Sequence, residues 1–312
     1  MDLQVNGHRD VDVATADESS WRRLLAEVAG QGVTSWCPTL ISAPLPVLDA
    51  RLAAIGDRAG QPGPNVISVH LEGPYLGAAH GAHQAVAADR IDMEWIAGLP
   101  AHVGIVTLGP EREGALDAIR LLRERGIVVA LGHTQATAEQ TEAAIEAGAT
   151  MFTHLYNAAG PLHHREPGAL GVALTDDRLV GGLIADGVHV DVRMMRLAWR
   201  AKGSDRIALV TDAAAFDDAA LVDWAPRLAD GTLAGSALRM NEAVRRTVDE
   251  VGISLIDAVN AASAVPASVL GLDDRGSITP GCRADLVAMS DDFQVQQTWV
   301  AGLPQLAGVN GS

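Results

Sequence analysis

The chain has 312 residues, of which 48% are hydrophobic and 20% charged, so it can bury a large core and is not expected to be disordered. Its net charge of −16 argues against general binding to nucleic acid or to anionic membranes, because both need a cationic protein surface. The two cysteines, Cys37 and Cys282, have no CxxC partner, which predicts reduced thiols. No export signal and no apolar stretch of about 20 residues is recognisable, so we expect a cytoplasmic protein.

Short apolar runs alternate with amphipathic segments up to about residue 211, a pattern typical of βα units around a parallel sheet. The predicted strands are Leu3–Asn6, Val33–Leu40, Val66–Leu71, Val103–Leu108, Ile127–Leu131, Met151–Leu155, Leu179–Ala185 and Ile207–Thr211. The helix-like segments between them are Ser19–Ala29, Glu113–Arg125, Thr137–Ala147 and Val192–Lys202. Eight strands in this rhythm predict an α/β protein with a (β/α)₈ TIM-type barrel over residues 1–271.

The pattern changes after residue 212. Gly231–Ser236 is typical of a glycine-bounded loop or short strand, and Leu238–Val251 and Leu255–Ala262 are typical of helices. Turns and short strands follow, at Ala284–Met289 and Thr298–Ala301. We therefore expect residues 272–312 to form a C-terminal β appendage outside the barrel.

Four predicted strands end on polar side chains that suit a metal centre, namely Glu72, His133, His154 and Asp212. The carboxyl ends of barrel strands converge on one face, where active sites are built. A Glu/His/His set suits a Zn²⁺-like ion with an open position, and a nearby free Asp can take up and return a proton. A single histidine of this kind is more often a hydrogen-bonded core residue. Two of them, beside two carboxylates, favour a metal centre.

Eight motifs occur in one ordered series, which is more specific than any of them alone. They are Asp2–Gly7, His70–Pro74, Gly132–Thr134, His154–Ala158, Arg165–Gly168, Ala185–Val190, Thr211–Ala213 and Leu233–Ser236. In this order and at this spacing the chain resembles the N-acetylglucosamine-6-phosphate deacetylase family of the amidohydrolase superfamily, from residue 2 to about residue 301.

The resemblance implies a set of catalytic roles. Glu72, His133 and His154 would hold one divalent metal ion per subunit, with zinc as the first choice and iron or manganese as alternatives. Asp212 would deprotonate water and later protonate the departing amine, and His189 would contact the substrate near the reacting amide.

The resemblance also implies a phosphorylated N-acetyl amino sugar as the bound partner. Arg165 would bind the phosphate and would reach into the partner subunit's site, which predicts a homodimer. An arginine offers a planar fork to a phosphate, whereas a lysine offers a point charge. The other residues implied to line the substrate pocket are Ala82, Asn157, Ala158, Leu233, Ala234 and Gly235.

The reaction that follows from the resemblance is metal-dependent hydrolysis of N-acetylglucosamine 6-phosphate to glucosamine 6-phosphate and acetate. N-acetylgalactosamine 6-phosphate differs in the orientation of one hydroxyl and stays an alternative. Two further alternatives are another amidohydrolase activity and a catalytically impaired sugar-phosphate-binding protein. The roles of His80, His83, His163 and His164 stay open.

Two departures modify these expectations. Many superfamily members carry His-x-His at the end of the first strand, where this chain has Gln4-Val5-Asn6. Neutral amides are poor ligands for a zinc-like ion, so we expect one metal ion rather than two. In the family, residues before this motif build half of a small β-sandwich with the C-terminal strands. We expect that half to be absent here, which leaves sheet edges unpaired and lowers stability or solubility.

Overall fold

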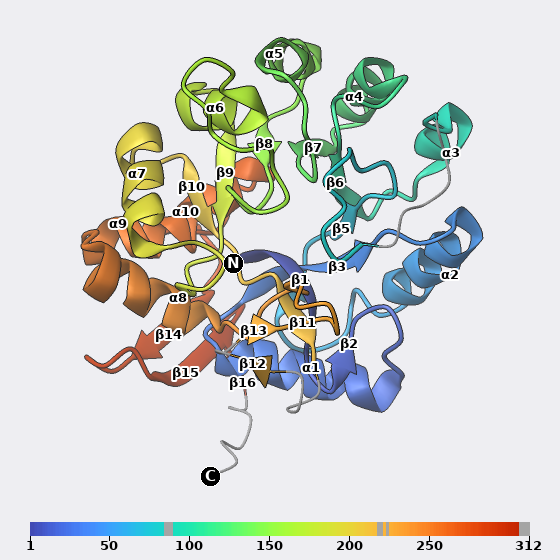
Figure 1. Ribbon diagram of the computed structural model, residues 1–312. Helices are drawn as coiled ribbons and strands as arrows, with labels where there is room; N and C mark the ends of the chain where they lie inside the picture. Colours follow the sequence, from blue (N-terminus) through green and yellow to red (C-terminus); the bar gives the residue numbers. More distant parts are fainter. Residues whose placement is uncertain (84–89, 217–220, 223–224, 306–312) are drawn as a thin grey trace.

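A closed ring of parallel strands forms the centre of the computed structural model, which describes residues 1–83, 90–216, 221–222 and 225–305 (Figure 1). Neighbouring strands follow the order β10-β9-β8-β7-β6-β5-β3-β1-β11. The bounds are β1 Asp2–Arg9, β3 Ser35–Ile41, β5 Val69–Glu72, β6 Val103–Leu108, β7 Val128–Leu131, β8 Met151–Phe152, β9 Val180–Leu183, β10 Ile207–Leu209 and β11 Ala213–Ala215.

The last strand closes the ring onto the first. The chain continues from β10 into β11, which pairs in parallel with β1 through Val5 and Ala213. The amide of Asp212 donates to the carbonyl of Gln4 at 2.9 Å, while the amide of Val210 still donates to Leu183 of β9. Residues 207–215 therefore bridge β9 and β1, and the predicted TIM-type barrel is confirmed.

Helices surround the ring, as Figure 1 shows. They are α1 Glu18–Gly30, α2 Leu45–Gly56, α3 Met93–Gly98, α4 Ala115–Glu124, α5 Ala138–Ala147, α6 Gly168–Thr175, α7 Val192–Lys202 and α8 Met240–Arg246. A capping box of Thr137 and Gln140 starts α5, because each side chain accepts a hydrogen bond from the other residue's backbone amide. A π-helical turn, Thr247–Val251, extends α8 and is followed by α9 Leu255–Ala261 and α10 Ala264–Val269. None of the helices among the described residues is long and apolar enough to cross a membrane.

The C-terminal strands form a separate antiparallel sheet of β14 Leu286–Met289, β15 Val295–Val300 and β16 Leu303–Gln305. The sheet is attached to the barrel at the end of α1, where the hydroxyl of Thr298 donates to the carbonyl of Ala29 at 2.8 Å. Its surface still exposes apolar side chains, including Leu303 at 68%. The boundary between residues 271 and 272 falls in the connection between α10 and β14, and stays a prediction.

Several predicted boundaries are wrong. The strand expected over Met151–Leu155 ends at Phe152, because the chain turns there and carries Thr153 and His154 toward the site. The strand expected over Val66–Leu71 is divided into β4 Asn65–Val66 and β5. The helix expected over Leu238–Val251 begins at Met240 and becomes π-helical at Thr247. Further short strand pairs are β2 Val11–Asp12 with β1, and β12 Leu221–Val222 with β13 Ala225–Pro226.

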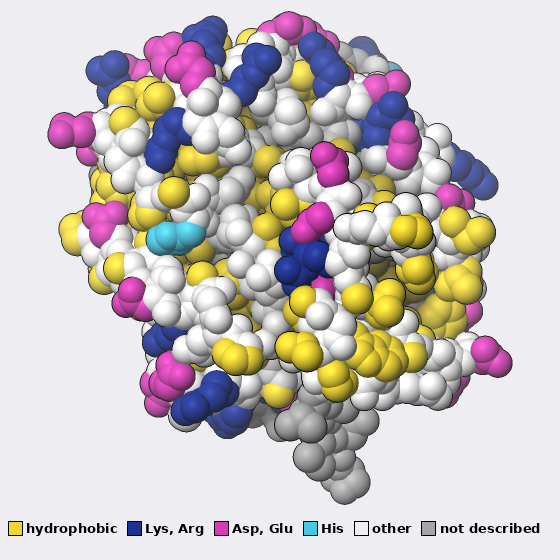
Figure 2. Space-filling model, turned by 180° about the vertical axis from the view of Figure 1, so that it is seen from behind, with side chains coloured by type: hydrophobic (Ala, Val, Ile, Leu, Met, Phe, Trp, Pro, Cys, Tyr) yellow, Lys and Arg dark blue, Asp and Glu magenta, His cyan; other side chains and the backbone are white. Residues whose placement is uncertain are grey.

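The face opposite to the view of Figure 1 carries acidic and basic side chains interspersed around its rim and near its middle, with apolar side chains gathered on one side (Figure 2). No continuous basic area covers this face, as far as it is described.

Candidate metal centre and active site

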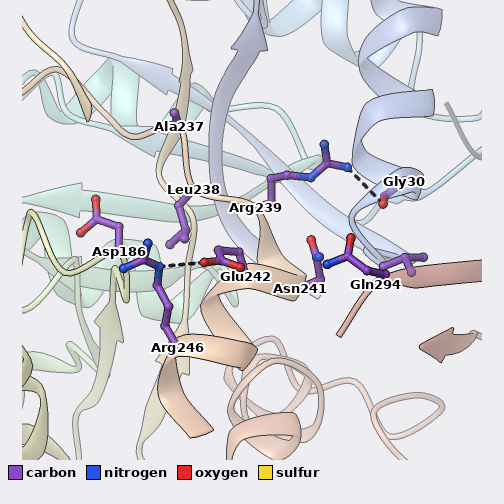
Figure 3. A pocket seen from close by; sticks show the side chains of 10 residues that line it. Gly30, Asp186, Ala237, Leu238, Arg239, Asn241, Glu242, Arg246 and Gln294 are labelled. Carbon is purple, nitrogen blue, oxygen red and sulfur yellow. Dashed lines mark hydrogen bonds and ion pairs between the residues drawn. The ribbon is translucent and has the colours of Figure 1, made fainter. Parts of the chain in front are cut away.

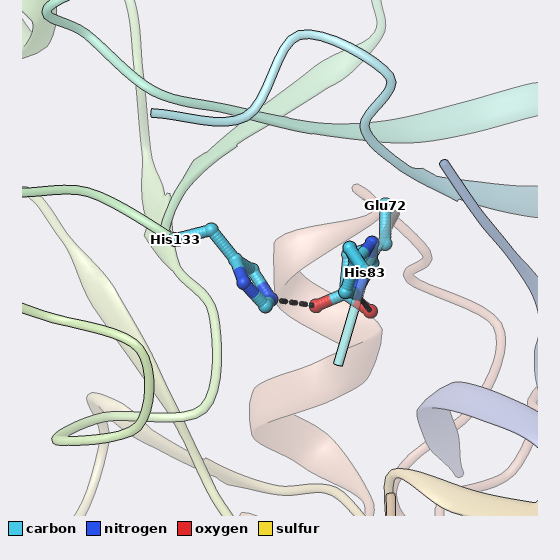
Figure 4. Close-up of side chains that lie close together, drawn as sticks. All are labelled: Glu72, His83 and His133. Atoms are coloured by element: carbon cyan, nitrogen blue, oxygen red, sulfur yellow. Dashed lines mark hydrogen bonds and ion pairs between the residues drawn. The ribbon is translucent and has the colours of Figure 1, made fainter. Parts of the chain in front are cut away.

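Glu72 ends β5 and is 98% buried among three imidazole rings. Its Oε1 lies 2.9 Å from Nε2 of His154 and 3.2 Å from Nε2 of His133. Its Oε2 lies 3.4 Å from Nε2 of His83, whose ring is next to the carboxylate in Figure 4. The structure thus brings together the three predicted metal ligands and adds His83, a residue whose role the sequence left open.

The ends of β7 and β8 place the two predicted histidine ligands side by side. Gly132 precedes His133, and a Cβ at this position would overlap the side chain of Thr153, so a glycine lets the two strand ends approach. His133 itself adopts a left-handed φ of 50°, which turns its ring inward. The Nε2 atoms of His133 and His154 are consequently only 3.0 Å apart.

The hydrogen-bond partners fix the tautomer of His133 but not that of His83. Nδ1 of His133 lies 3.1 Å from the carbonyl of Ala79, so it carries the proton and leaves the lone pair of Nε2 facing Glu72. Nδ1 of His83 lies 3.2 Å from the hydroxyl of Ser42 and 3.4 Å from the amide of Ser42, contacts that are compatible with either tautomer. Glu72, His83 and His133 offer ligand atoms within 4.8 Å of one another, so His83 is a further candidate to hold an ion.

The cluster has the electrostatics of a cation site. Burial lowers the pKa of His154, but its hydrogen bond to Glu72 and the charge of that carboxylate outweigh burial and raise the pKa to about 9. Burial raises the pKa of Glu72, yet its contacts with the three imidazole rings bring it well below its usual value. Positive charge is thus favoured at His154, whereas burial lowers the pKa of His133, which keeps that ring neutral as a metal ligand must be.

Spacing and donor chemistry also fit a divalent ion. The three atoms Glu72 Oε1, His133 Nε2 and His154 Nε2 are separated by 2.9–3.2 Å. Ligands about 2.0–2.2 Å from one ion lie at separations close to these. Nδ1 of His154 is buried without a hydrogen-bond partner among the described residues. No described neighbour therefore forces the proton onto Nε2, the nitrogen that would bind the ion. A Glu/His/His set accepts zinc, iron or manganese.

Asp212 lies beside this cluster and is held by the two amides that replace His-x-His. Its Oδ1 accepts hydrogen bonds from Nε2 of Gln4 at 3.0 Å and from Nδ2 of Asn6 at 2.7 Å. Nε2 of Gln4 also donates to Glu72 Oε1 at 2.9 Å, and Oε1 of Gln4 accepts from the hydroxyl of Thr153 at 2.9 Å. Burial and the charge of Glu72 raise the pKa of Asp212 to about 6. Sequence reasoning identified the two amides as poor ligands but missed their role as donors.

His189 is oriented by a carboxylate that the sequence reasoning also missed. Oδ2 of Asp186 lies 2.6 Å from Nδ1 of His189, and Oδ1 of Asp186 accepts from the amides of Val188 and His189 at 2.8 Å. Nδ1 therefore carries a proton, which leaves Nε2 of His189 free to accept or donate. The signal in the sequence was an Asp three residues before the histidine, directly after a predicted strand.

The loops predicted to line the substrate pocket border the cluster in part. The carbonyl of Ala158 accepts from the amide of Thr134, the residue after His133, at 2.9 Å. Nδ2 of Asn157 donates to the carbonyl of Leu155 at 3.2 Å. A Cβ on Gly81, next to Ala82, would be 3.6 Å from the ring of His133.

The Leu233–Gly235 loop approaches from the other side of the site. A Cβ on Gly235 would lie 2.9 Å from the carbonyl of Asp212, so only a glycine fits against the strand end there. Within the part of the chain that the structure describes, Arg165 makes no contact with its own Glu72 cluster. Arg165 is exposed, and its described side-chain hydrogen bond is with Nε2 of His164 at 2.9 Å. The ring of His163 packs against that of His164.

A cavity of about 430 Å³ shares Asp186 with the site (Figure 3). Its two arginines are engaged, because Arg239 donates to the carbonyl of Gly30 at 3.2 Å and Arg246 donates to Glu242 at 2.9 Å. None of the predicted metal ligands lines this cavity, which is therefore separate from the metal cluster.

Comparisons with known proteins agree with this geometry. The model of the Amidohydrolase family matches residues 106–304. An N-acetylgalactosamine-6-phosphate deacetylase from Escherichia coli O157:H7 is 38% identical over 97% of this chain and 85% of its own length. An N-acetylglucosamine-6-phosphate deacetylase from Bos taurus is also 38% identical, over 97% and 81%.

Solved structures show the same likeness. The N-acetylglucosamine-6-phosphate deacetylase from Pasteurella multocida has a TM-score of 0.91 at 32% identity and covers 97% of this chain and 84% of its own. The enzyme of that name from Mycobacterium smegmatis, solved as a mutant in complex with N-acetyl-D-glucosamine-6-phosphate, has a TM-score of 0.90 at 33% identity. It covers 98% of this chain and 85% of its own.

Proposed function

Because the chain belongs to the amidohydrolase family, and within it to the N-acetyl amino-sugar-6-phosphate deacetylases, we propose that it hydrolyses the N-acetyl group of N-acetylglucosamine 6-phosphate. The products are glucosamine 6-phosphate and acetate. The observation that carries the proposal is the convergence of Glu72, His133 and His154, with Asp212 held next to them. N-acetylgalactosamine 6-phosphate is the second candidate substrate, favoured by the similarity to the E. coli deacetylase.

Glu72, His133 and His154 would hold the ion, with zinc as the first choice. A divalent ion at this position supplies Lewis acidity for the amide carbonyl and makes water a stronger acid. Asp212 removes the proton from the attacking water and returns it to the leaving amine. Its Oδ1 is anchored by Gln4 and Asn6, which leaves Oδ2 directed to this exchange.

His189 contacts the substrate near the reacting amide. Its Nδ1 is committed to Asp186 at 2.6 Å, so Nε2 is the atom that meets the substrate. The carboxylate fixes the ring in one orientation and one tautomer, so less conformational entropy is lost when the substrate binds in a reactive geometry.

Arg165 binds the phosphate in the site of a second copy of the chain, which makes the enzyme a homodimer. Support comes from its exposure and from the lack of a described contact with its own cluster. The sugar occupies the space bordered by Ala82, Asn157, Ala158 and the Leu233–Gly235 loop. We also propose a barrel domain over residues 1–271, an appendage over 272–312, and a cytoplasmic location, in keeping with two unpaired cysteines.

Acetate release by the purified chain tests the proposal. The protein is stripped of metal and reconstituted separately with Zn²⁺, Fe²⁺ and Mn²⁺, and both sugar phosphates are offered at several concentrations. The ratio of the two kcat/KM values identifies the substrate. Absence of acetate from both sugars with all three ions would overturn the proposal, provided that circular dichroism shows the reconstituted protein to be folded.

A further inference from the structure

Glu111, in the loop after β6, ties together the loops on either side of it. Its Oε1 accepts hydrogen bonds from the amide of Ala78 at 3.0 Å, in the loop after β5, and from the amide of Gln135 at 2.9 Å, in the loop after β7. Its Oε2 accepts from the hydroxyl of Thr134 at 2.5 Å. One carboxylate thus joins three consecutive loops at the strand ends that carry the metal cluster.

Two of these loops meet at His133, whose ring and backbone both form hydrogen bonds with Ala79. The carbonyl of Ala79 accepts from Nδ1 of His133 at 3.1 Å, and the amide of Ala79 donates to the carbonyl of His133 at 3.3 Å. Glu111 therefore holds the residue before Ala79 and the residue after His133. The hydrogen bond that selects the tautomer of His133 lies between two segments that the carboxylate fixes in place.

The surrounding backbone leaves room for this carboxylate. A Cβ on Gly77 would overlap Oε1 of Glu111, and a Cβ on Gly109 would overlap the backbone of Gly77. Thr134 is fully buried, and its hydroxyl also accepts from the amide of Ala136 at 2.9 Å. The hydroxyl of Thr134 therefore donates its hydrogen to Glu111 and accepts from Ala136, while both oxygens of Glu111 act only as acceptors.

We propose that Glu111 is a positioning residue for the metal centre, which fixes the tautomer and direction of His133 through Ala79. The inference rests on the proposed function only in that His133 binds the ion. Partners that orient a metal-binding histidine typically contribute about 10- to 100-fold to metal affinity. The sequence reasoning gave Glu111 no role, because it follows a strand without belonging to a recognised motif.

Glu111→Gln is the conservative variant. Its amide oxygen can still accept from the amides of Ala78 and Gln135, and its NH₂ group can donate to the hydroxyl of Thr134. Glu111→Ala removes all three bonds. Glu113→Ala is the matched control, because Glu113 is in the same loop with its side chain 73% exposed.

The test is a Zn²⁺ titration of the full-length apoprotein against a chromophoric chelator. The dissociation constant of Glu111→Ala is expected to rise about 10- to 100-fold, with Glu111→Gln and Glu113→Ala within about threefold of the parent. An unchanged constant for Glu111→Ala, even with a lower melting temperature, would reduce Glu111 to a structural role and overturn the proposal. Equal losses in the Ala and Gln variants would also overturn it, because charge rather than geometry would then set affinity.

A second variant covers the case in which Glu111→Ala fails to fold. Thr134→Val removes the Oε2 arm together with the acceptor of the Ala136 amide. It is expected to weaken Zn²⁺ binding several-fold, and no change would contradict the proposal. These readouts need no turnover. A protein that binds Zn²⁺ in this graded way but releases no acetate would refute the proposed function and leave the role of Glu111 standing.

Discussion

Replacement of Gln4 by leucine tests whether the buried amide holds the two carboxylates together. Gln4 is 0% exposed and donates to Glu72 at 2.9 Å and to Asp212 at 3.0 Å. Hydrogen bonds to charged groups contribute about 1.5–3 kcal/mol each, so the loss of two costs about 3 kcal/mol at the lower end. The lower end applies because Asp212 keeps its bond from Asn6 and leucine refills most of the volume.

The assay is thermal unfolding of the metal-free protein, where no ion compensates the two carboxylates. The stranded hydroxyl of Thr153, which loses its acceptor on Gln4, adds about 1 kcal/mol. A chain of this size shifts by about 2 °C per kcal/mol, so the melting temperature of Gln4→Leu is expected to fall by about 8 °C. Gln297→Leu is the matched control, because Gln297 donates to the uncharged carbonyls of Thr298 and Gln305. A fall of less than about 1 °C for Gln4→Leu, or an equal fall for both variants, would refute the reasoning.

The same site allows a double-mutant test. Gln4→Leu leaves the hydroxyl of Thr153 without its acceptor, since Thr153 donates to Oε1 of Gln4 at 2.9 Å. Thr153→Val in that background removes the stranded hydroxyl and is expected to recover about 1 kcal/mol. The two substitutions should therefore be less than additive.

Three further predictions concern catalysis, substrate binding and acid stability. Asp212→Asn should lower kcat by about 10²–10⁴-fold with unchanged metal content, and a near-normal rate would remove Asp212 from its role. Arg165→Ala should raise KM for the phosphorylated sugar far more than for the unphosphorylated one, and equal effects would exclude phosphate recognition. Burial lowers the pKa of His8 from 6.5 to about 4, so its neutral form stabilises the fold above pH 6.5 and this contribution is lost as pH falls toward 4. His8→Phe should flatten that part of the curve of unfolding free energy against pH by roughly 3 kcal/mol, and a curve as steep as that of the parent would contradict the shift.

The convergence of Glu72, His133 and His154 could be predicted because it depends only on which end of each strand carries the residue. Parallel strands of one ring end on one face, so Glu72, His133 and His154 were expected to meet once their strands were recognised. The structure brings their ligand atoms within 2.9–3.2 Å of one another, although the strand before His154 has only two residues. An error of three residues in a strand boundary does not change which end of the strand carries the residue.

The residues that support this cluster could not be predicted in the same way. Asp186, Glu111 and His83 act from loops, whose path depends on hydrogen bonds between segments far apart in the sequence. No hydrophobic periodicity encodes such a path. The carboxylate of Glu111 meets an amide 33 residues earlier and another 24 residues later, which only the folded chain reveals.

The two amides of the first strand, Gln4 and Asn6, have a role that the sequence did not predict. Gln4 and Asn6 were excluded as ligands because neutral amides bind zinc-like ions poorly. In the structure, Nε2 of Gln4 lies between Glu72 and Asp212, where it donates to both carboxylates. An uncharged donor at this point does what a second cation would do between two carboxylates, so Asp212 needs no second ion to stay in place. The expected stoichiometry after reconstitution is therefore one ion per chain, measured by elemental analysis of gel-filtered protein. Two tightly held ions would show that the amide bridge opens and that Asp212 becomes a ligand.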